Sequence, residues 1–337
     1  MATSGGGTTY SYGYDARGNR TTATGTTALA HNAANQITTS GYTYDAAGNL
    51  TKTPSLSSVT YNGAGQMTAA TTSTGTGTYT YAGTSQTELT HQTTDTGDNI
   101  DYVYGRPDGN GQPVIEQVTL DAGTAYIDHD PTTGQPLVLR TTTGTEAYYI
   151  IDGFGSPVEF INQSTVTSTV YQYDPYGAYQ TTTATGSAAA QNPYRYVGGT
   201  YDRTTGWIKY GQRWYNPTTG RFTTQDAHSF LTDPAQGNRY AYAGDDPINN
   251  TDPTGKFSLS LGGVVGAVVG GATSAAFDGF FGPVLGGAAS GCLSGSVTAL
   301  IDGSSVSEAC AEGATLGAVS GGAGATVKYA KNALRSS

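Results

Sequence analysis

The chain has 337 residues and a net charge of −10; only 12% of its residues are charged, and it contains 49 glycines and 25 tyrosines. The acidic balance argues against a phosphate-binding surface, so nucleic acid is not an expected partner. Two cysteines, Cys292 and Cys310, are too few for a disulfide framework or a closed zinc site, and we predict no metal and no other cofactor.

The first motif in chain order is a short sequence that recurs with substitutions. It occurs at Gly13–Thr21 (GYDARGNRT) and Thr43–Thr51 (TYDAAGNLT). A more divergent copy lies at Thr60–Thr68 (TYNGAGQMT), and partial copies lie at Ile151–Gly155 and Tyr173–Gly177. Each copy predicts a strand end, an Asp-x-x-Gly turn and a returning strand. Asp bonds its own backbone at the first turn position, and Gly accepts a positive φ at the last. Such repetition favours an extended scaffold or container over a compact enzyme.

The N-terminus has neither a basic patch nor an apolar core, so no signal peptide is predicted. The repeats begin by Tyr10 without a capping segment, although repeat arrays need caps. We therefore expect an upstream shell to be missing from this chain; the alternative is a short gene product that never had one.

Residues up to about 255 have the composition of short strands separated by turns. Aromatic and β-branched residues recur in short segments, and Pro/Gly motifs lie between them. The expected strands include Tyr79–Tyr81, Asp101–Tyr104, Ala147–Ile151 and Thr169–Tyr173, and the expected turns include Asp130–Gly134, Asn216–Gly220 and Asp252–Gly255. No amphipathic helical stretch of useful length occurs there, so the predicted fold class is all-β.

The densest block of motifs begins at residue 192. It contains Asn192–Tyr196, Gly206–Pro217, Gly220–Asp226, Asn238–Tyr242 and Asp252–Gly255, and it holds both tryptophans of the chain. Its arginines can stack on aromatic rings or pair with aspartates. We predict an aromatic plug at 192–255, preceded by a repeat-built β-sheet region at 1–191 and followed by a variable segment at 256–337.

The composition changes after Gly255. No charged residue occurs at 257–277 or at 279–301. Glycines recur at four-residue spacing, as at Gly262, Gly266 and Gly270. On a helix this spacing forms a stripe of small residues that favours close packing, so a Gly/Ala-rich, mainly helical tail is predicted. Membrane insertion and disorder are the alternatives.

Together these motifs resemble the RHS repeat-associated core with its upstream YD repeats. Bacterial RHS polymorphic toxins, teneurins and the C components of bacterial ABC toxins share both features. The ordered series Arg213–Pro217 (RWYNP), Gly220–Phe222 (GRF) and Asp252–Gly255 (DPTG) carries the resemblance, which covers residues 10–255. It implies a β-sheet strip that spirals into a hollow shell, plugged at one end by the core. The few repeats present here predict a curved strip or a partial shell.

The resemblance also implies a self-cleaving pair of aspartates. Many members cut themselves just past Asp-Pro-x-Gly, and the matching residues are Asp226 and Asp252, with Arg221 placed to orient or stabilise them and cleavage near Lys256. Two close carboxylates can share one proton, so that one acts as acid while the other activates water. Here Ala227 stands where proline is usual, and Lys256 replaces the usual leucine. We therefore expect both aspartates to be structural and the chain to stay intact, with autoproteolysis as its only enzymatic alternative.

Two functional hypotheses follow. In the first, the chain is a secreted or surface-delivered carrier used in intercellular competition and matched by an immunity protein. Its own C-terminal segment is the cargo, as an effector or as a translocation segment that leads to one. In the second, it is a structural or adhesive cell-surface module that binds a glycan, a membrane, another target-cell surface or a partner sheet edge, and its tail is inert or an anchor. An inactive RHS fragment is a further alternative.

Overall fold

The computed structural model describes residues 2–3, 9–83, 87–107, 112–131, 133–163, 167–183, 187–227, 237–255 and 259–260. They fall into two compact units, and the larger one lies within 1–106, 113–129 and 135–258. Residues on both sides of the expected boundary at 191/192 belong to this larger unit, and the proposed division into three domains stays a prediction. The expected helical tail and both cysteines lie outside the described residues.

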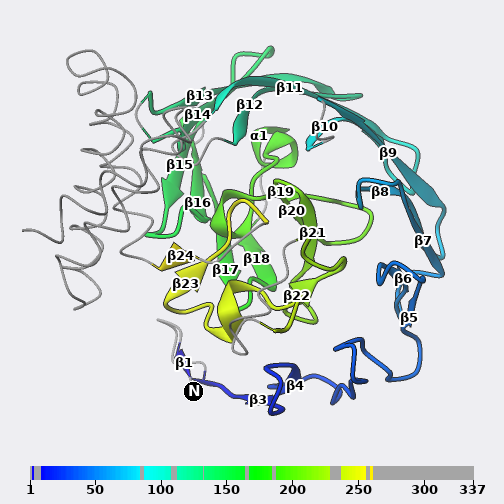
Figure 1. The fold of residues 1–337 in the computed structure, drawn as a ribbon. Coiled ribbons are helices and arrows are strands. Elements are labelled where there is room, and N and C mark those ends of the chain that lie inside the picture. The colour runs from blue at the N-terminus through cyan, green and yellow to red at the C-terminus, as the bar shows by residue number, and fades with distance from the viewer. Residues whose placement is uncertain are drawn as a thin grey trace, which may run out of the picture. The chain divides into compact units, whose positions relative to one another are not determined.

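A twelve-stranded antiparallel sheet dominates the larger unit (Figure 1). Its strands follow the chain order without a crossover, so each strand from β7 to β18 pairs with the next. They are β7 (Ser58–Tyr61), β8 (Met67–Thr71), β9 (Thr76–Ala82), β10 (Glu88–Thr93), β11 (Asn99–Pro107), β12 (Pro113–Leu120), β13 (Gly123–His129), β14 (Pro136–Thr141), β15 (Glu146–Ile151), β16 (Pro157–Asn162), β17 (Ser168–Tyr173) and β18 (Tyr179–Thr183). The predicted all-β strip of hairpins is confirmed.

Shorter elements flank this sheet. Before it come β1 (Ala2–Thr3), β2 (Thr9–Tyr10), β3 (Tyr12–Tyr14), β4 (Arg20–Ala23), β5 (Thr43–Tyr44) and β6 (Leu50–Lys52). After it come α1 (Ser187–Gln191), the 3₁₀ turns η1 (Tyr196–Gly198) and η3 (Ala243–Asp245), and strands β19 (Thr200–Tyr201), β20 (Ile208–Tyr210), β21 (Arg213–Asn216), β22 (Arg221–Phe222) and β23 (Asn250–Thr251). Strand β24 (Leu259–Ser260) belongs to the second unit.

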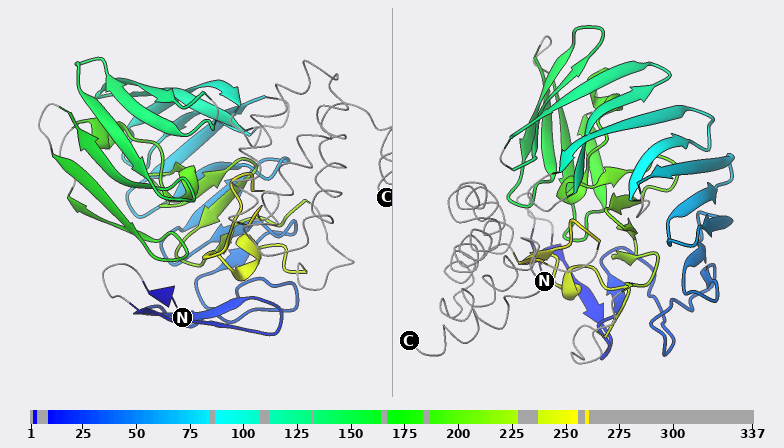
Figure 2. Two further views of the ribbon diagram at one scale, coloured as in Figure 1. Left: turned by 90° about the vertical axis from the view of Figure 1, so that its left-hand side faces the viewer. Right: turned by 45° about the horizontal axis from the view of Figure 1, so that its top comes forward.

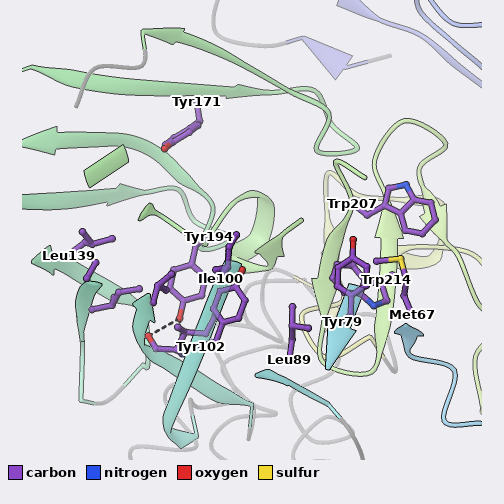
Figure 3. Packing of buried hydrophobic residues seen from close by; sticks show 14 of the residues in the cluster. Met67, Tyr79, Leu89, Ile100, Tyr102, Leu139, Tyr171, Tyr194, Trp207 and Trp214 are labelled. Carbon is purple, nitrogen blue, oxygen red and sulfur yellow. Dashed lines mark hydrogen bonds between the residues drawn. The ribbon is translucent and has the colours of Figure 1, made fainter. Parts of the chain in front are cut away.

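The long sheet bends around residues 192–255, which we call the core block (Figures 1 and 2). Strands β19 to β22 form a four-stranded sheet of their own on its concave side. Along β9 the buried and exposed side chains alternate, with Tyr79 buried and Thr78 and Thr80 exposed, as expected of a strand with one face on a core. The ring of Tyr79 packs edge-on against Trp214 of the core block, with 5.6 Å between ring centroids (Figure 3). Large aromatic side chains thus join the sheet to the core block.

The repeated Asp-x-x-Gly turn has the same hydrogen bonds in each described copy. Asp15 Oδ1 accepts the backbone N–H groups of Arg17 and Asn19, both at 2.9 Å, and Asp45 does the same for the residues two and four places on. The same pair of bonds occurs at Asn62, Asp152 and Asp174. The glycine of each turn has a positive φ, for example 75° at Gly18. The turn chemistry predicted from the sequence is confirmed.

One further copy of this turn was not predicted from the sequence. Asn32 Oδ1 accepts the backbone N–H groups of Ala34 and Gln36, each at 2.9 Å. The position usually held by glycine is Asn35, with a φ of 60°. Asn enters this left-handed region more readily than other residues that carry a Cβ, so it replaces glycine here.

The core block contacts the ends of these turns. On the side of the turns, the hydrogen-bonding groups are mostly backbone carbonyls and the side chain of the last turn residue. The hydrogen bonds join Asn238 to Asn19 (3.1 Å), Tyr240 to Gly48 (2.6 Å), Gln212 to Gln66 (2.6 Å), Val197 to Ser156 (2.9 Å) and Tyr215 to Tyr176 (2.7 Å). One part of the chain therefore binds repeat turns that come from widely separated parts of the sequence.

Substitution of a turn aspartate tests this arrangement. We expect Asp174→Ala to lower the free energy of unfolding by about 1–2 kcal/mol, because two backbone N–H groups lose their acceptor. Asp174→Asn keeps an oxygen at the same place and is the matched control, with a smaller loss. Urea unfolding of both variants measures the difference, and equal losses would contradict the role of the Oδ1 acceptor.

Lys209 of β20 is a buried cation at the junction between core block and sheet. Its side chain is 5% exposed, and Nζ donates to the carbonyl of Thr87 at 2.5 Å and to that of Gly211. Nζ also lies 5.7 Å from the ring centroid of Tyr81. Burial lowers the pKa of Lys209 to about 7, while the charge of Glu88 acts in the opposite direction.

A pH titration of stability tests this burial. The folded-state pKa lies below the usual 10.5, so the unfolded chain binds more protons between about pH 7 and pH 10. We expect the free energy of unfolding of the wild type to rise over this range relative to Lys209→Met. Urea titrations of both proteins at several pH values measure it. A constant difference between the two proteins would show that Lys209 keeps its ordinary pKa.

Candidate functional site

Asp226 and Asp252 lie close together in the core block. Asp226 follows β22 and Asp252 follows β23, and their residues are 8% and 2% exposed. A single nitrogen, Nη2 of Arg213 in β21, lies 3.0 Å from Asp226 Oδ2 and 3.1 Å from Asp252 Oδ2. The structure therefore brings the two aspartates together on one guanidinium group.

Arg213 is held by three further contacts. Its Cζ lies 3.6 Å from the ring centroid of Phe222, within cation–π distance. Its Nε donates to the carbonyl of Gly255 at 2.5 Å, and Nη1 donates to that of Arg239 at 3.4 Å. Burial lowers the pKa of Arg213, and the charges of Asp252 and Asp226 act in the opposite direction. An arginine nevertheless keeps its charge in a protein.

Neighbouring groups fix the two aspartates in turn. Arg239 donates through Nε to the carbonyl of Asp226 at 2.9 Å, and the Asp226 N–H donates to the carbonyl of Arg239, also at 2.9 Å. The hydroxyl of Thr254 donates to Asp252 Oδ1 at 3.2 Å. Both aspartates are therefore positioned from more than one side.

Gly255 is required by the close approach of the chain at this point. Its φ is +66°, and a Cβ on it would lie 2.5 Å from the carbonyl oxygen of Tyr210. The Asp-Pro-Thr-Gly turn thus fits tightly against the backbone of Tyr210 and Arg213. Lys256, near which the family resemblance implies cleavage, lies outside the described residues.

Arg221, which the sequence analysis placed beside the aspartates, makes its described contacts elsewhere. It donates to the carbonyl of Asn35 and to Asn19 Oδ1, and its Cζ lies 4.8 Å from the ring centroid of Tyr240. The guanidinium at the aspartate pair belongs to Arg213, which sequence reasoning missed. The RWYNP motif marked Arg213 as a residue of this block but did not indicate which arginine pairs with the aspartates. A catalytic role for Asp226, Asp252 and Arg221 stays a prediction.

One guanidinium group bridges the two members of the aspartate pair. In aspartyl-protease chemistry two carboxyls instead face each other and share a proton, so that one of them can act as an acid. As described, the cluster is suited to holding the Asp-Pro-Thr-Gly turn in place.

In the part of the chain that the structure describes, no group of three or more His, Cys, Asp or Glu side chains is placed to hold a metal ion. Within the same residues, no helix combines the length and apolar content needed to cross a membrane.

Comparison with known families agrees with this architecture. Residues 1–248 match the family described as Teneurin YD-shell. The chain belongs to the teneurin YD-shell family. The resemblance to YD-repeat proteins inferred from the sequence is thereby confirmed, and the chain is a YD-shell scaffold.

Relatives of this YD-shell chain are much longer proteins. Salivary gland surface protein 1 of Aedes aegypti is 32% identical over 179 residues, which are 51% of this chain and 5% of that protein. The tRNA3(Ser)-specific nuclease WapA of Bacillus spizizenii is 30% identical over 167 residues, 49% of this chain and 7% of that protein. Teneurin-1 of Gallus gallus is 26% identical over 133 residues, 38% of this chain and 5% of that protein. The chain spans less than a tenth of their length.

Solved structures share the fold of this YD-shell chain. TcdB2-TccC3 without its hypervariable C-terminal region matches 73% of this chain with a TM-score of 0.56 and 17% identity, over 13% of its own length. TcdB2-TccC3-Cdc42 matches 78% of this chain with a TM-score of 0.55 and 18% identity, over 14% of its own length. At these identities the likeness concerns the fold alone.

The buried ion cluster can be tested by removal of its cation. We expect Arg213→Met to lower the free energy of unfolding by about 3–5 kcal/mol, because two buried carboxylates lose their counter-charge. Arg140→Met is the matched control: its pair with Asp128 is half-exposed, so the loss should stay below about 1 kcal/mol. Urea unfolding measures both. Similar losses for the two variants would mean that the cluster is not a stabilising centre.

Proposed function

We propose that this YD-shell scaffold carries residues 256–337 as a variable C-terminal segment and delivers it to other cells in intercellular competition. The proposed domains are the YD-repeat sheet at 1–191, the core at 192–255 and the carried segment at 256–337. One observation carries the proposal: Arg213 binds the carbonyl of Gly255 together with Asp226 and Asp252. The chain is thus anchored in the core immediately before the segment begins.

The relatives support a carrier. Three of them are named as tRNA nucleases, and the TccC3 protein is described as having a hypervariable C-terminal region. Those activities are the relatives' own, since the shared part is a small fraction of each protein. A related shell in those proteins is consistent with a common scaffold that carries different C-terminal segments.

We also propose that this carrier works outside the cell or at the cell surface and is matched by an immunity protein in the producing cell. The name of the Aedes aegypti relative, a surface protein, is consistent with this location. The carried segment is proposed to stay covalently attached, because Asp226 and Asp252 both pair with the guanidinium group of Arg213 and so serve as structural residues.

A co-incubation assay tests delivery. Cells secreting the full chain and cells secreting a chain that ends at Gly255 are each mixed with target cells lacking the protein and its immunity factor. We expect lower recovery of target cells only with the full chain, because the proposed cargo begins after Gly255. Equal recovery with both chains would contradict delivery of a harmful segment. If both chains also bind the target cells, the adhesive alternative would replace the carrier.

An intact-mass spectrum of the purified full chain is the control for attachment. A single species at 34.6 kDa is expected. Two fragments that meet near residue 256 and disappear in the Asp252→Asn variant would show self-cleavage and a released cargo.

A further inference from the structure

A small cavity lies where three distant segments of the chain meet. Its volume is about 120 Å³, and its walls come from β3, from the repeat turn that follows β17, and from residues 245–248 of the core block. Sites that enclose a whole small molecule have volumes of about 300–1,000 Å³. The cavity therefore suits a single functional group, such as the end of a longer side chain or ligand.

Three tyrosines form the aromatic wall of this cavity. The ring of Tyr12 meets that of Tyr176 edge to face, with 5.0 Å between centroids, and the hydroxyl oxygens of Tyr14 and Tyr176 lie 2.5 Å apart. Tyr176 is fully buried, and its ring already has the guanidinium group of Arg20 at 4.3 Å from the centroid. Tyr14 is 42% exposed. Its ring is therefore the aromatic surface that remains open to a ligand.

The hydroxyl of Tyr12 is a buried polar group without a described partner. Its oxygen is shielded from solvent, and no hydrogen bond to it is found within the residues that the structure describes. Buried hydroxyls are usually paired, since an unpaired one costs about 1–3 kcal/mol. A ligand in the cavity that donates a hydrogen bond would supply the missing partner.

Asp245 brings a carboxylate to the cavity from a turn with an unusual backbone. Three successive residues of η3 have a positive φ: 53° at Ala243, 62° at Gly244 and 65° at Asp245. Strain of this kind persists only where the surroundings fix it, and it is common at ligand-binding sites. Here the hydroxyl of Tyr176 donates to the carbonyl of Asp245 at 3.4 Å, and a Cβ on Gly18 would clash with Asp245 Oδ2. The carboxylate is thus held in place at the cavity.

The negative charge at the cavity lacks a paired cation. None of the ion pairs found within the described residues includes Asp245. Burial raises the pKa of Asp245 to about 7; the charge of Arg221 acts in the opposite direction, and that of Asp15 adds to the rise. Asp246 supplies a second carboxylate, and the described lining contains no basic side chain. A bound cation would compensate both carboxylates.

From this combination we propose that the cavity between β3 and residues 245–248 binds a primary ammonium group at the end of an alkyl chain. An ammonium group has three N–H donors, and the two carboxylates and the Tyr12 hydroxyl offer three acceptor groups. The face of the Tyr14 ring attracts a cation within about 6 Å. Ile248, which is 50% exposed at the cavity, gives the alkyl chain an apolar contact.

Other classes of ligand fit this lining less well. An anion would meet the carboxylates of Asp245 and Asp246, and an apolar group would leave the Tyr12 hydroxyl unpaired. A quaternary ammonium group can lie against the Tyr14 ring, but it has no N–H for the Tyr12 hydroxyl. A free alkylamine and a lysine side chain of a partner protein have the same ammonium chemistry, so experiment must distinguish these two sources.

Calorimetric titration of the full chain with n-butylamine tests this site. The titration is run at about pH 8, where Asp245 is ionised and the amine is protonated. The comparison probes are 1-butanol, which has no charge, and butyltrimethylammonium, which has no N–H donor. We expect saturable binding of n-butylamine and at least about tenfold weaker binding of both other probes, which corresponds to about 1.4 kcal/mol. Equal binding of the three probes, or no saturable binding of n-butylamine, would overturn the proposal.

Two variants locate the site. Tyr12→Phe removes only the unpaired hydroxyl, so it should weaken n-butylamine binding without lowering the melting temperature. Asp245→Asn should weaken binding at least about tenfold. Asp121→Asn is the matched control, because Asp121 is an exposed carboxylate outside the cavity lining, and its affinity should be unchanged. Wild-type affinity in both Tyr12→Phe and Asp245→Asn would overturn the proposal, since n-butylamine would then bind elsewhere.

A lysine with capped α-amino and carboxyl groups distinguishes the two sources of the ammonium group. If it binds as tightly as n-butylamine and loses affinity in Asp245→Asn, the cavity accepts a lysine side chain of a partner protein. If only n-butylamine binds, the cavity is specific for a free alkylamine. Either result supports an ammonium site, and the variants above decide whether it is this cavity.

Discussion

The repeat turn must satisfy its own backbone before the core block can contact it. A single side-chain oxygen of Asp or Asn accepts two backbone N–H groups in each copy, as Asp15 does for Arg17 and Asn19. Tight turns otherwise leave such donors to water, and in the copies at Asp152 and Asp174 both bonds are partly buried, where an unpaired donor is costly. With the donors satisfied, carbonyls such as that of Gly48 are available to the core block. The hydrogen bonds within each turn are thus a condition for the contacts between the turns and the core block.

Inside the core block, Arg213 likewise satisfies several polar groups at once. It brings together two aspartates that are far apart in sequence and the carbonyl of Gly255. Burial of three charges has a large desolvation cost, which is recovered only when the geometry and the hydrogen bonds are good. The additional contacts from Arg239 and Thr254 supply those bonds. The cluster therefore holds the Asp-Pro-Thr-Gly turn in place within the core block.

The sequence predicted most of the fold because the determining signals are local. Asp-x-x-Gly turns and alternating strands such as Thr76–Ala82 depend on residues a few places apart, and both were found. The turn at Asn32 was missed because Asn35 replaces its glycine. Arg213 could not be chosen over Arg221, since the pairing of guanidinium and carboxylate depends on the packing of β21 and β22. The cavity between Tyr12 and Asp245 depends on contacts between segments far apart in the chain, and such contacts leave no motif in the sequence.

Binding of repeat turns by the core block also bears on how such a gene can change. A gene that encodes similar copies, such as Gly13–Thr21 and Thr43–Thr51, can gain or lose one repeat unit. In most repeat proteins such an event only alters the length of the array. Here Asn238 contacts Asn19 while Tyr240 contacts Gly48, so one unit more or less would shift the turns against their partners. Chains with a different number of repeats would then misfold, because their turns would no longer meet their partners in the core block. The core block would thus restrict the number of repeats that a folded chain can have.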